Sequence, residues 1–433
     1  MTIIRKNRVF WLIVLAGVII RTCLVYFSYD LNTDTDAWKY DHIAQNIAFK
    51  GIYSIQRLET PNAEPTALYP LVYPALLASV YYMFGYNPHL INYLHIALYV
   101  IACIVIFKLA SIIFNETAGV WAILFFSFEP VVLLYSIIAM PEILIAVFLP
   151  LSIYLLIKFL QPDTRNRIRY KYLILSNIIL GIAMLTKPVI FYFPLLSILF
   201  AFIYGRKSIR RAIIASLVTI IVVGLVISPW IIRNYKIWHK FCFVEVKGFV
   251  SPEKESLLKK IDYVKWIYRK YPGSIKNPAI RYILGTATIT FYRTFVRTDN
   301  LHKYYMSDKI KPEGKNMDLE LSVNLSGPNA NDYIRLWRYS WKFAVLELLF
   351  LSTLLIIYVL ASTGIFFALK YKKIKELLVL VFVILYFATI ILLDSTSNSR
   401  YRFASAPFYA ILAGYGLSRL LAFRNKTAKI EAR

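Results

Sequence analysis

Charged residues are scarce in this chain of 433 residues. Asp, Glu, Lys and Arg together make up 17% of it, hydrophobic residues make up 59%, and the mean hydropathy is +0.57. A soluble protein of this length has about a quarter charged and about half apolar residues, so no water-soluble core would hide the apolar excess. The composition excludes a soluble enzyme and predicts a membrane protein.

Residue types that build common sites are also few. Of the three cysteines, Cys23 and Cys103 fall within apolar runs and Cys242 lies in a polar stretch, so no disulfide framework is predicted. The five histidines show no close spacing of the kind that binds a metal ion. The sequence also has no repeat, no glycine-rich phosphate loop and no Ser/His/Asp arrangement. Its function must therefore be sought in less familiar patterns.

What the chain does contain is long apolar runs. A helix needs about 20 mostly apolar residues to cross the hydrocarbon layer, and roughly ten runs approach this length. They are residues 9–29, 90–114, 118–135, 143–160, 172–186, 189–204, 212–232, 343–369, 377–393 and 403–423. The first run has no small-residue cleavage pattern after it and is interpreted as an uncleaved helix. We expect an all-α polytopic membrane protein.

The net charge is +26, from 50 basic and 24 acidic residues. The positions of the basic residues along the chain indicate the orientation of the protein in the membrane. Short loops rich in Lys and Arg stay on the cytoplasmic side of a membrane. With ten spans, every short basic cluster falls on the same face. These clusters are residues 5–8, 165–171, 206–211, 370–375 and 424–429. We therefore expect both termini in the cytoplasm, in a multi-pass protein of the cell (inner) membrane.

Two polar stretches are then placed outside, where we expect the functional site. The chain divides into an N-terminal transmembrane region (1–232) that includes a first extracytoplasmic loop (30–89), a large extracytoplasmic loop (233–342) and C-terminal helices (343–433). Residues 70–86 are expected along the membrane surface. Residues 256–275 have the pattern of a basic helix that lies at the interface or packs on other helices.

Three carboxylates open the first outer loop, on Asp34, Asp36 and Asp41. The spacing predicts a short helix over 36–50, capped by one of the two residues before it and ended by Gly51. Capping and solvation explain such carboxylates in many loops. The functional alternative is a general base, which needs a carboxylate close to the oxygen whose proton it removes.

Ionisable residues also stand in or beside the apolar runs, where they are costly and hence candidate functional groups. The acidic ones are Glu129 and Glu142, and the basic ones are Lys187, Arg233, Arg400 and Arg402. A lone cation there can simply extend to the interface. Their common placement on the outer face favours a site that holds an anion such as a lipid phosphate.

Arg21 lies within the first apolar run, about two-thirds of the way across if the helix starts near Arg8. Two arrangements are compatible with this position. The side chain can extend outward to the interface, or it can pair with a carboxylate of the cluster from Asp34 to Asp41.

Taken in order, these pieces resemble the GT-C glycosyltransferases, the polytopic superfamily of protein O-mannosyltransferases and the lipid A aminoarabinose transferase. The resemblance covers nearly the whole chain. Its pieces are Asp36 four residues before Tyr40, Ile43-Ala44, Gly51-Ile52-Tyr53-Ser54, the proline-punctuated residues 69–74, Tyr135-Ser136 leading to Glu142, Thr186-Lys187-Pro188, Pro229-Trp230 with Arg233-Asn234-Tyr235, and Arg400-Tyr401-Arg402. The broad bacterial branch that uses polyprenyl-phosphate-linked sugars is the most similar.

The resemblance implies transfer of a sugar from a lipid-monophosphate donor to a glycolipid, glycan or protein acceptor on the outer face, with inversion at the anomeric carbon. It assigns the catalytic carboxylate to Asp36, by its spacing to Tyr40, and the second acidic position to Glu142. The cations that would bind the donor phosphate are Lys187, Arg233, Arg400 and Arg402. Asp34, Tyr40 and Arg21 would support them. Ala37 stands where the mannosyltransferases have Glu, so neither mannose nor a protein acceptor is implied.

The chemistry agrees with these residue types. A sugar on a lipid phosphate has an activated leaving group, so the protein needs a base, cations and orientation. No nucleic acid or nucleotide is required, and no metal motif is present, although Asp36 and Glu142 together would suit a divalent cation.

Two other functions fit the same outer cations. One is a transporter or flippase for a polyprenyl-linked glycan, which should carry charged or broken helices near mid-membrane in corresponding halves of the chain. The other is a glycan polymerase or ligase with lipid-pyrophosphate donors, for which the helix from Asp36 to Tyr40 has no explanation.

Overall fold

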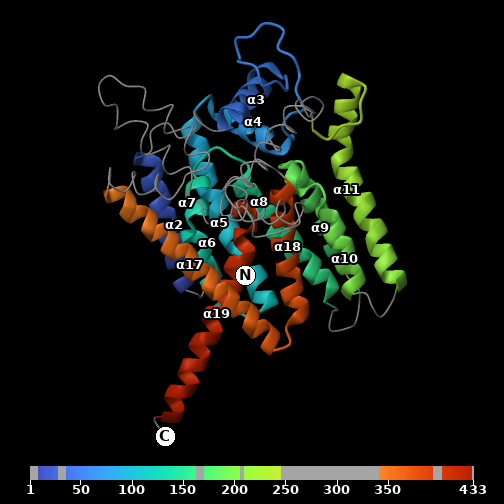
Figure 1. The fold of residues 1–433 in the computed structure, drawn as a ribbon. Helices are drawn as coiled ribbons and strands as arrows, with labels where there is room; N and C mark the ends of the chain where they lie inside the picture. Colours follow the sequence, from blue (N-terminus) through green and yellow to red (C-terminus); the bar gives the residue numbers. More distant parts are fainter. Residues whose placement is uncertain are drawn as a thin grey trace, which may run out of the picture.

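The computed structural model describes residues 8–27, 36–161, 170–204, 209–244, 341–393 and 402–431. Within them the regular secondary structure is entirely helical (Figure 1). The helices are α2 (Arg8–Phe27), α3 (Ala37–Lys50), α4 (Val72–Phe84), α5 (Pro88–Ile113), α6 (Glu116–Phe128), α7 (Pro130–Tyr135), α8 (Glu142–Leu160), α9 (Tyr170–Met184), the short 3₁₀ helix η1 (Pro188–Ile190), α10 (Phe193–Tyr204), α11 (Ile209–Trp238), α17 (Trp341–Lys370), α18 (Ile374–Leu393) and α19 (Arg402–Glu431).

Every apolar run predicted from the sequence is helical, and the polytopic all-α fold class is confirmed. Six described helices are long and apolar enough to cross a membrane, and they lie in α2, α5, α8, α11, α17 and α19. The predicted single span over 118–135 is wrong in detail. It is broken into α6 and α7, because Glu129 adopts extended backbone (ψ 126°) and Pro130 lacks the N–H that a continuous helix would need.

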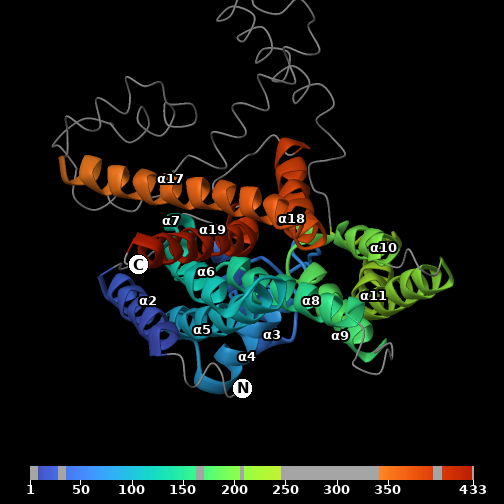
Figure 2. The ribbon, with the colours of Figure 1, turned by 90° about the horizontal axis from the view of Figure 1, so that it is seen from below.

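The helices form a bundle with a cap at one end. Figure 1 shows α3 and α4 at the upper end, while the last turns of α19 leave the lower end. The end of α11 rises to the level of the cap. Figure 2 shows α17 running along α19 at one side of the bundle, with α9, α10 and α11 at another edge. The start of α3, the start of α8 and the ends of α9 and α11 therefore lie toward the capped end.

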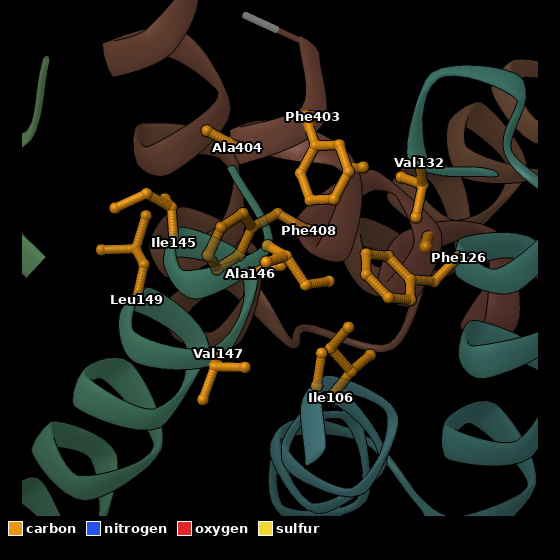
Figure 3. Close-up of a cluster of buried hydrophobic side chains, with 14 of the residues drawn as sticks. Ile106, Phe126, Val132, Ile145, Ala146, Val147, Leu149, Phe403, Ala404 and Phe408 are labelled. Carbon is orange, nitrogen blue, oxygen red and sulfur yellow. The ribbon is translucent and has the colours of Figure 1, made fainter. Parts of the chain in front are cut away.

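Buried side chains from helices far apart in sequence share one core beneath the cap. Figure 3 shows Ile106 of α5, Phe126 of α6, Val132 of α7 and Phe408 of α19 packed together. Phe126 and Phe403 contact each other edge to face, with ring centroids 6.4 Å apart. This core fixes the beginning of α8 and the beginning of α19 relative to each other.

Two glycines let α19 approach its neighbours closely. A Cβ atom at Gly414 would lie 2.4 Å from the carbonyl oxygen of Ala118 in α6, and one at Gly416 would lie 2.2 Å from that of Leu360 in α17. Small residues at helix contacts are typical of membrane bundles, where packing and not the hydrophobic effect drives association. The position of α19 is therefore set by backbone contact on two sides.

Candidate functional site

The cap is held together by the carboxylate of Asp41. It accepts hydrogen bonds from Tyr81 of α4, from Tyr86 beyond it and from Gln45 of its own helix. Gly51 ends α3 as predicted, because it adopts the left-handed conformation (φ 67°) that glycine tolerates without strain. Asp41 thus joins α3 to α4.

Asp36 lies at the start of α3, one position before the first helical residue. Its side chain makes no capping hydrogen bond to the helix, so helix capping does not explain this carboxylate. Oδ1 instead accepts from Lys39 Nζ at 2.7 Å and from the hydroxyl of Tyr69 at 3.4 Å. The side chain of Asp36 remains 26% exposed, so an acceptor can reach it from outside.

The two partners of Asp36 have perturbed acidities. Burial lowers the pKa of Lys39, but its hydrogen bonds and electrostatic interactions with Asp36 and Tyr69 together outweigh this, and the net shift is upward. Burial, followed by the negative charge of Asp36, raises the pKa of Tyr69. Both partners thus stay protonated around neutral pH and donate to the carboxylate.

Tyr40, a predicted supporting residue, lies beneath this group. Its ring packs on Tyr69 with centroids 4.6 Å apart and on Tyr73 at 5.1 Å. The Tyr73 hydroxyl lies 3.0 Å from Nε2 of His95 in α5. The rings therefore form a column from Asp36 into the bundle.

Residues 66–72, which we call the linker segment, connect the cap to the other candidate groups. Tyr69 in the segment reaches Asp36, and the N–H of Val72 donates to the carbonyl of Leu185 at 2.9 Å. The carbonyl of Thr66 accepts from Arg233 Nη1 at 2.8 Å. The linker segment thus brings the neighbourhoods of Asp36, Lys187 and Arg233 together.

Glu142 and Lys187 form a buried ion pair. Lys187 Nζ lies 2.7 Å from Glu142 Oε1, with 10% of the lysine side chain and 2% of the glutamate side chain exposed. Glu142 begins α8, and Lys187 follows α9 just before Pro188. Glu142 also interacts electrostatically with Tyr73 and His95 at the foot of the aromatic column.

Arg233 lies near the end of α11 in a ring of aromatic side chains. Its guanidinium carbon is 5.2 Å from the ring centroid of Tyr53, 5.0 Å from that of Trp230 and 5.2 Å from that of Trp238. Its hydrogen bonds with other described residues, to Thr66 and Asn234, both use Nη1. Among the described residues Nε and Nη2 make none, so this partly exposed cation can bind an anion.

Arg402 is placed differently from the prediction that it binds the donor phosphate. It is fully buried, and its Nε lies 2.7 Å from Oε1 of Glu129, which is also fully buried. Tyr358 and Tyr409 lie beside the pair. The charge of Arg402 is therefore matched by a carboxylate inside the bundle.

Arg21 follows neither of the two arrangements predicted for it. It is fully buried, which excludes extension to the interface. Its guanidinium donates to Ser136 Oγ at 2.7 Å and to the carbonyls of Gly17 and Ser127 at 3.1 Å each, and it lies 3.7 Å from the ring centroid of Tyr99. Among the described residues, the groups that the Arg21 guanidinium contacts are neutral.

Some predictions lie outside the described residues. These are the roles of Asp34 and Arg400, the large loop over 245–340 and the interfacial helix over 256–275. Sequence reasoning missed the linker segment as a meeting point and the pairing of Glu129 with Arg402. The pairing of Glu129 with Arg402 could have been predicted, because opposite charges in two apolar runs favour an ion pair.

The two carboxylates that would suit a divalent cation, Asp36 and Glu142, lie in separate ion pairs. Asp36 is paired with Lys39 and Glu142 with Lys187, so each carboxylate already has an ammonium partner. Across the described ranges, no group of three or more His, Cys, Asp and Glu side chains is placed to hold a metal ion.

Comparisons with known proteins agree with this architecture. Residues 69–232 match the sequence profile of the dolichyl-phosphate-mannose-protein mannosyltransferase family. No match was found among curated protein sequences.

Among solved structures, the oligosaccharyltransferase AglB of Archaeoglobus fulgidus, in complex with an inhibitory peptide and a dolichol-phosphate, is similar over 99% of this chain at 16% identity and a TM-score of 0.58. ArnT of Cupriavidus metallidurans, bound to undecaprenyl phosphate, is similar over 95% at 15% identity and a TM-score of 0.53. The chain spans 52% of the length of the first and 61% of the second. The predicted resemblance is confirmed in these terms: residues 69–232 match the profile of the dolichyl-phosphate-mannose-protein mannosyltransferase family, and the chain shares the fold of AglB and ArnT.

Proposed function

We propose that this protein transfers a sugar from a polyprenyl-phosphate-linked donor to a glycolipid, glycan or protein acceptor. The linker segment carries the proposal, because it brings a partly exposed carboxylate, Asp36, to the same end of the bundle as Lys187 and Arg233. The family profile begins within this segment, at Tyr69, and two neighbours in fold are in complex with a lipid phosphate.

In the proposed reaction, Asp36 takes the proton of the acceptor hydroxyl. The acceptor oxygen then attacks the anomeric carbon, the bond from this carbon to the phosphate oxygen breaks, and the electron pair leaves with polyprenyl phosphate. Attack from the face opposite the phosphate inverts the anomeric carbon. Lys187 and Arg233 stabilise the negative charge on the departing phosphate, and Glu142 holds Lys187 in place.

The direct test replaces the base. Asp36→Asn keeps the shape of the side chain and removes its basicity, so transfer from a radiolabelled polyprenyl-phosphate sugar should fall by about 100-fold to 10,000-fold. Glu59→Gln, an exposed carboxylate of the same cap, is the matched control and should keep full activity. Full activity of folded Asp36→Asn protein would refute the assignment.

We also propose that the capped end faces the extracytoplasmic side of the inner membrane and that both termini are cytoplasmic. The opposite end carries the turn between α17 and α18 with the helix ends on either side of it, which contain Lys370, Lys372, Lys373 and Lys375, and the last turns of α19. Basic segments of this kind favour the cytoplasmic side. In a variant whose native cysteines are replaced by alanine, an impermeant thiol reagent should label Glu59→Cys in intact cells but not Lys373→Cys. The reverse labelling would invert the orientation.

A further inference from the structure

The connection between α6 and α8 is an interrupted helix surrounded by apolar side chains. It consists of Glu129, the six residues of α7 and the turn over 136–141. Glu129 and Ser136 within it, and Ser127 and Glu142 in the adjoining helices, are at most 2% exposed. Helix ends leave N–H and C=O groups without partners, and at membrane depth such groups must be satisfied by the protein.

Arg21 of α2 binds this connection on both sides of α7. Its Nη2 donates to the carbonyl of Ser127, before α7, and its Nε donates to Ser136 Oγ, after α7. The ring of Tyr99 stacks on the guanidinium, and the Tyr99 hydroxyl lies 2.6 Å from Ser127 Oγ. One arginine therefore fixes the separation of the two ends of α7.

Arg402 of α19 holds the same element through Glu129. Oε1 of Glu129 accepts from Arg402 Nε, while Oε2 accepts from the N–H of Val132 in the first turn of α7, both at 2.7 Å. The carboxylate thus caps α7 and ties it to α19. Phe403, the next residue, packs on Phe126 at the end of α6.

We infer that Arg21 and Arg402 are positioning residues that clamp α7 between α2 and α19, and so set the position of Glu142 and of its partner Lys187. A helix of six residues has little stability of its own, so its place depends on these contacts. Only the turn over 136–141 separates α7 from Glu142, so a shift of α7 also displaces Glu142. The catalytic consequence rests on the function proposed above.

Two readouts test the clamp. The double variant Glu129→Gln/Arg402→Gln removes both charges without leaving one buried alone, and Arg21→Lys keeps the charge but lacks the guanidinium fork that reaches two partners. For each folded variant we would measure kcat and KM, and also the labelling of Lys187 by an amine reagent, mapped by mass spectrometry. Ser152→Ala is the control, because it removes buried hydrogen bonds between α8 and α9 away from the clamp.

We expect kcat per folded molecule to fall at least tenfold and up to about 100-fold in both clamp variants, as displaced catalytic groups require. Labelling of Lys187 should rise several-fold. Ser152→Ala should lower only thermal stability. Unchanged Lys187 labelling in either folded clamp variant would overturn the inference. If the native protein transfers no sugar, the proposed function fails, but the labelling result still decides the clamp.

Discussion

The two buried ion pairs differ in access, although their N–O distances are the same. Glu142–Lys187 and Glu129–Arg402 are both 2.7 Å long. The lysine retains 10% exposure next to the linker segment, whereas the arginine has none and lies beside Tyr358 and Tyr409. A lysine at the rim can exchange its carboxylate for a phosphate, but a sealed guanidinium cannot do so without leaving Glu129 unpaired. Under the function proposed above, the Glu142–Lys187 pair serves the site and the Glu129–Arg402 pair serves the scaffold.

The largest effect is expected from breaking the sealed pair. Glu129→Leu leaves the Arg402 charge buried without its partner and should lower the free energy of unfolding by about 3–5 kcal/mol. Denaturant unfolding in detergent micelles measures this change. The double variant Glu129→Leu/Arg402→Leu should recover much of the loss, and a double variant as unstable as the single one would contradict the comparison.

Breaking the Glu142–Lys187 pair should lower activity as well as stability, because it leaves the buried Glu142 carboxylate without its ammonium partner. Lys187→Met removes a cation from the departing phosphate and should lower kcat/KM by about 100-fold. Lys187→Arg retains the charge and should recover part of this loss. Steady-state kinetics with a polyprenyl-phosphate sugar gives the values. Native kcat/KM in Lys187→Met would remove Lys187 from the site.

The scaffold can also be loosened without touching a charge. Gly416→Ala places a Cβ 2.2 Å from the Leu360 carbonyl oxygen, so α17 and α19 must separate, at a cost of about 1–3 kcal/mol. Gly224→Ala in α11 is the matched control, because its Cβ meets no atom within 4 Å. Thermal unfolding of both variants should show a loss only for Gly416→Ala. Equal melting temperatures of the two variants would mean that the close approach of α17 and α19 does not contribute to stability.

The smallest effect concerns pH and the contacts of Asp36. The pKa values of Lys39 and Tyr69 are raised in the fold, so their contribution is complete below about pH 10 and is lost as the pH rises through their folded pKa values. The loss should be about 0.5 kcal/mol for such partly exposed groups. Unfolding followed from pH 8 to 11 should show it in the native protein but not in Lys39→Met/Tyr69→Phe. An identical pH profile for the two would show that these contacts add no stability.

Much of the fold is predictable because it depends on local properties. Apolar length predicts each helix of the bundle, and Gly51 ends α3 because its backbone must adopt positive φ. The break at Glu129-Pro130 is missed when hydropathy is averaged over 118–135, although Pro130 itself indicates it. The mean hydropathy of a long segment does not show at which residue the helix is interrupted.

The site is less predictable because it depends on contacts between distant residues. Position and charge identify Asp36, Glu142, Lys187 and Arg233 as candidates. Arg402 has the same local signal, but its partner lies 273 positions away, and only the fold shows that the pair is sealed. Arg21 likewise finds hydroxyl, carbonyl and ring partners that no spacing in the sequence indicates.

We propose above all that the chain is a transferase that uses a lipid-phosphate donor at its capped end. The most direct test incubates the purified protein, in lipid nanodiscs, with a doubly labelled polyprenyl-phosphate sugar and membrane acceptors. We predict that free polyprenyl phosphate appears in equal amount to the sugar on the acceptor, and that neither forms with Asp36→Asn. Movement of the intact donor across a vesicle membrane without release of lipid phosphate would contradict the account and indicate a transporter.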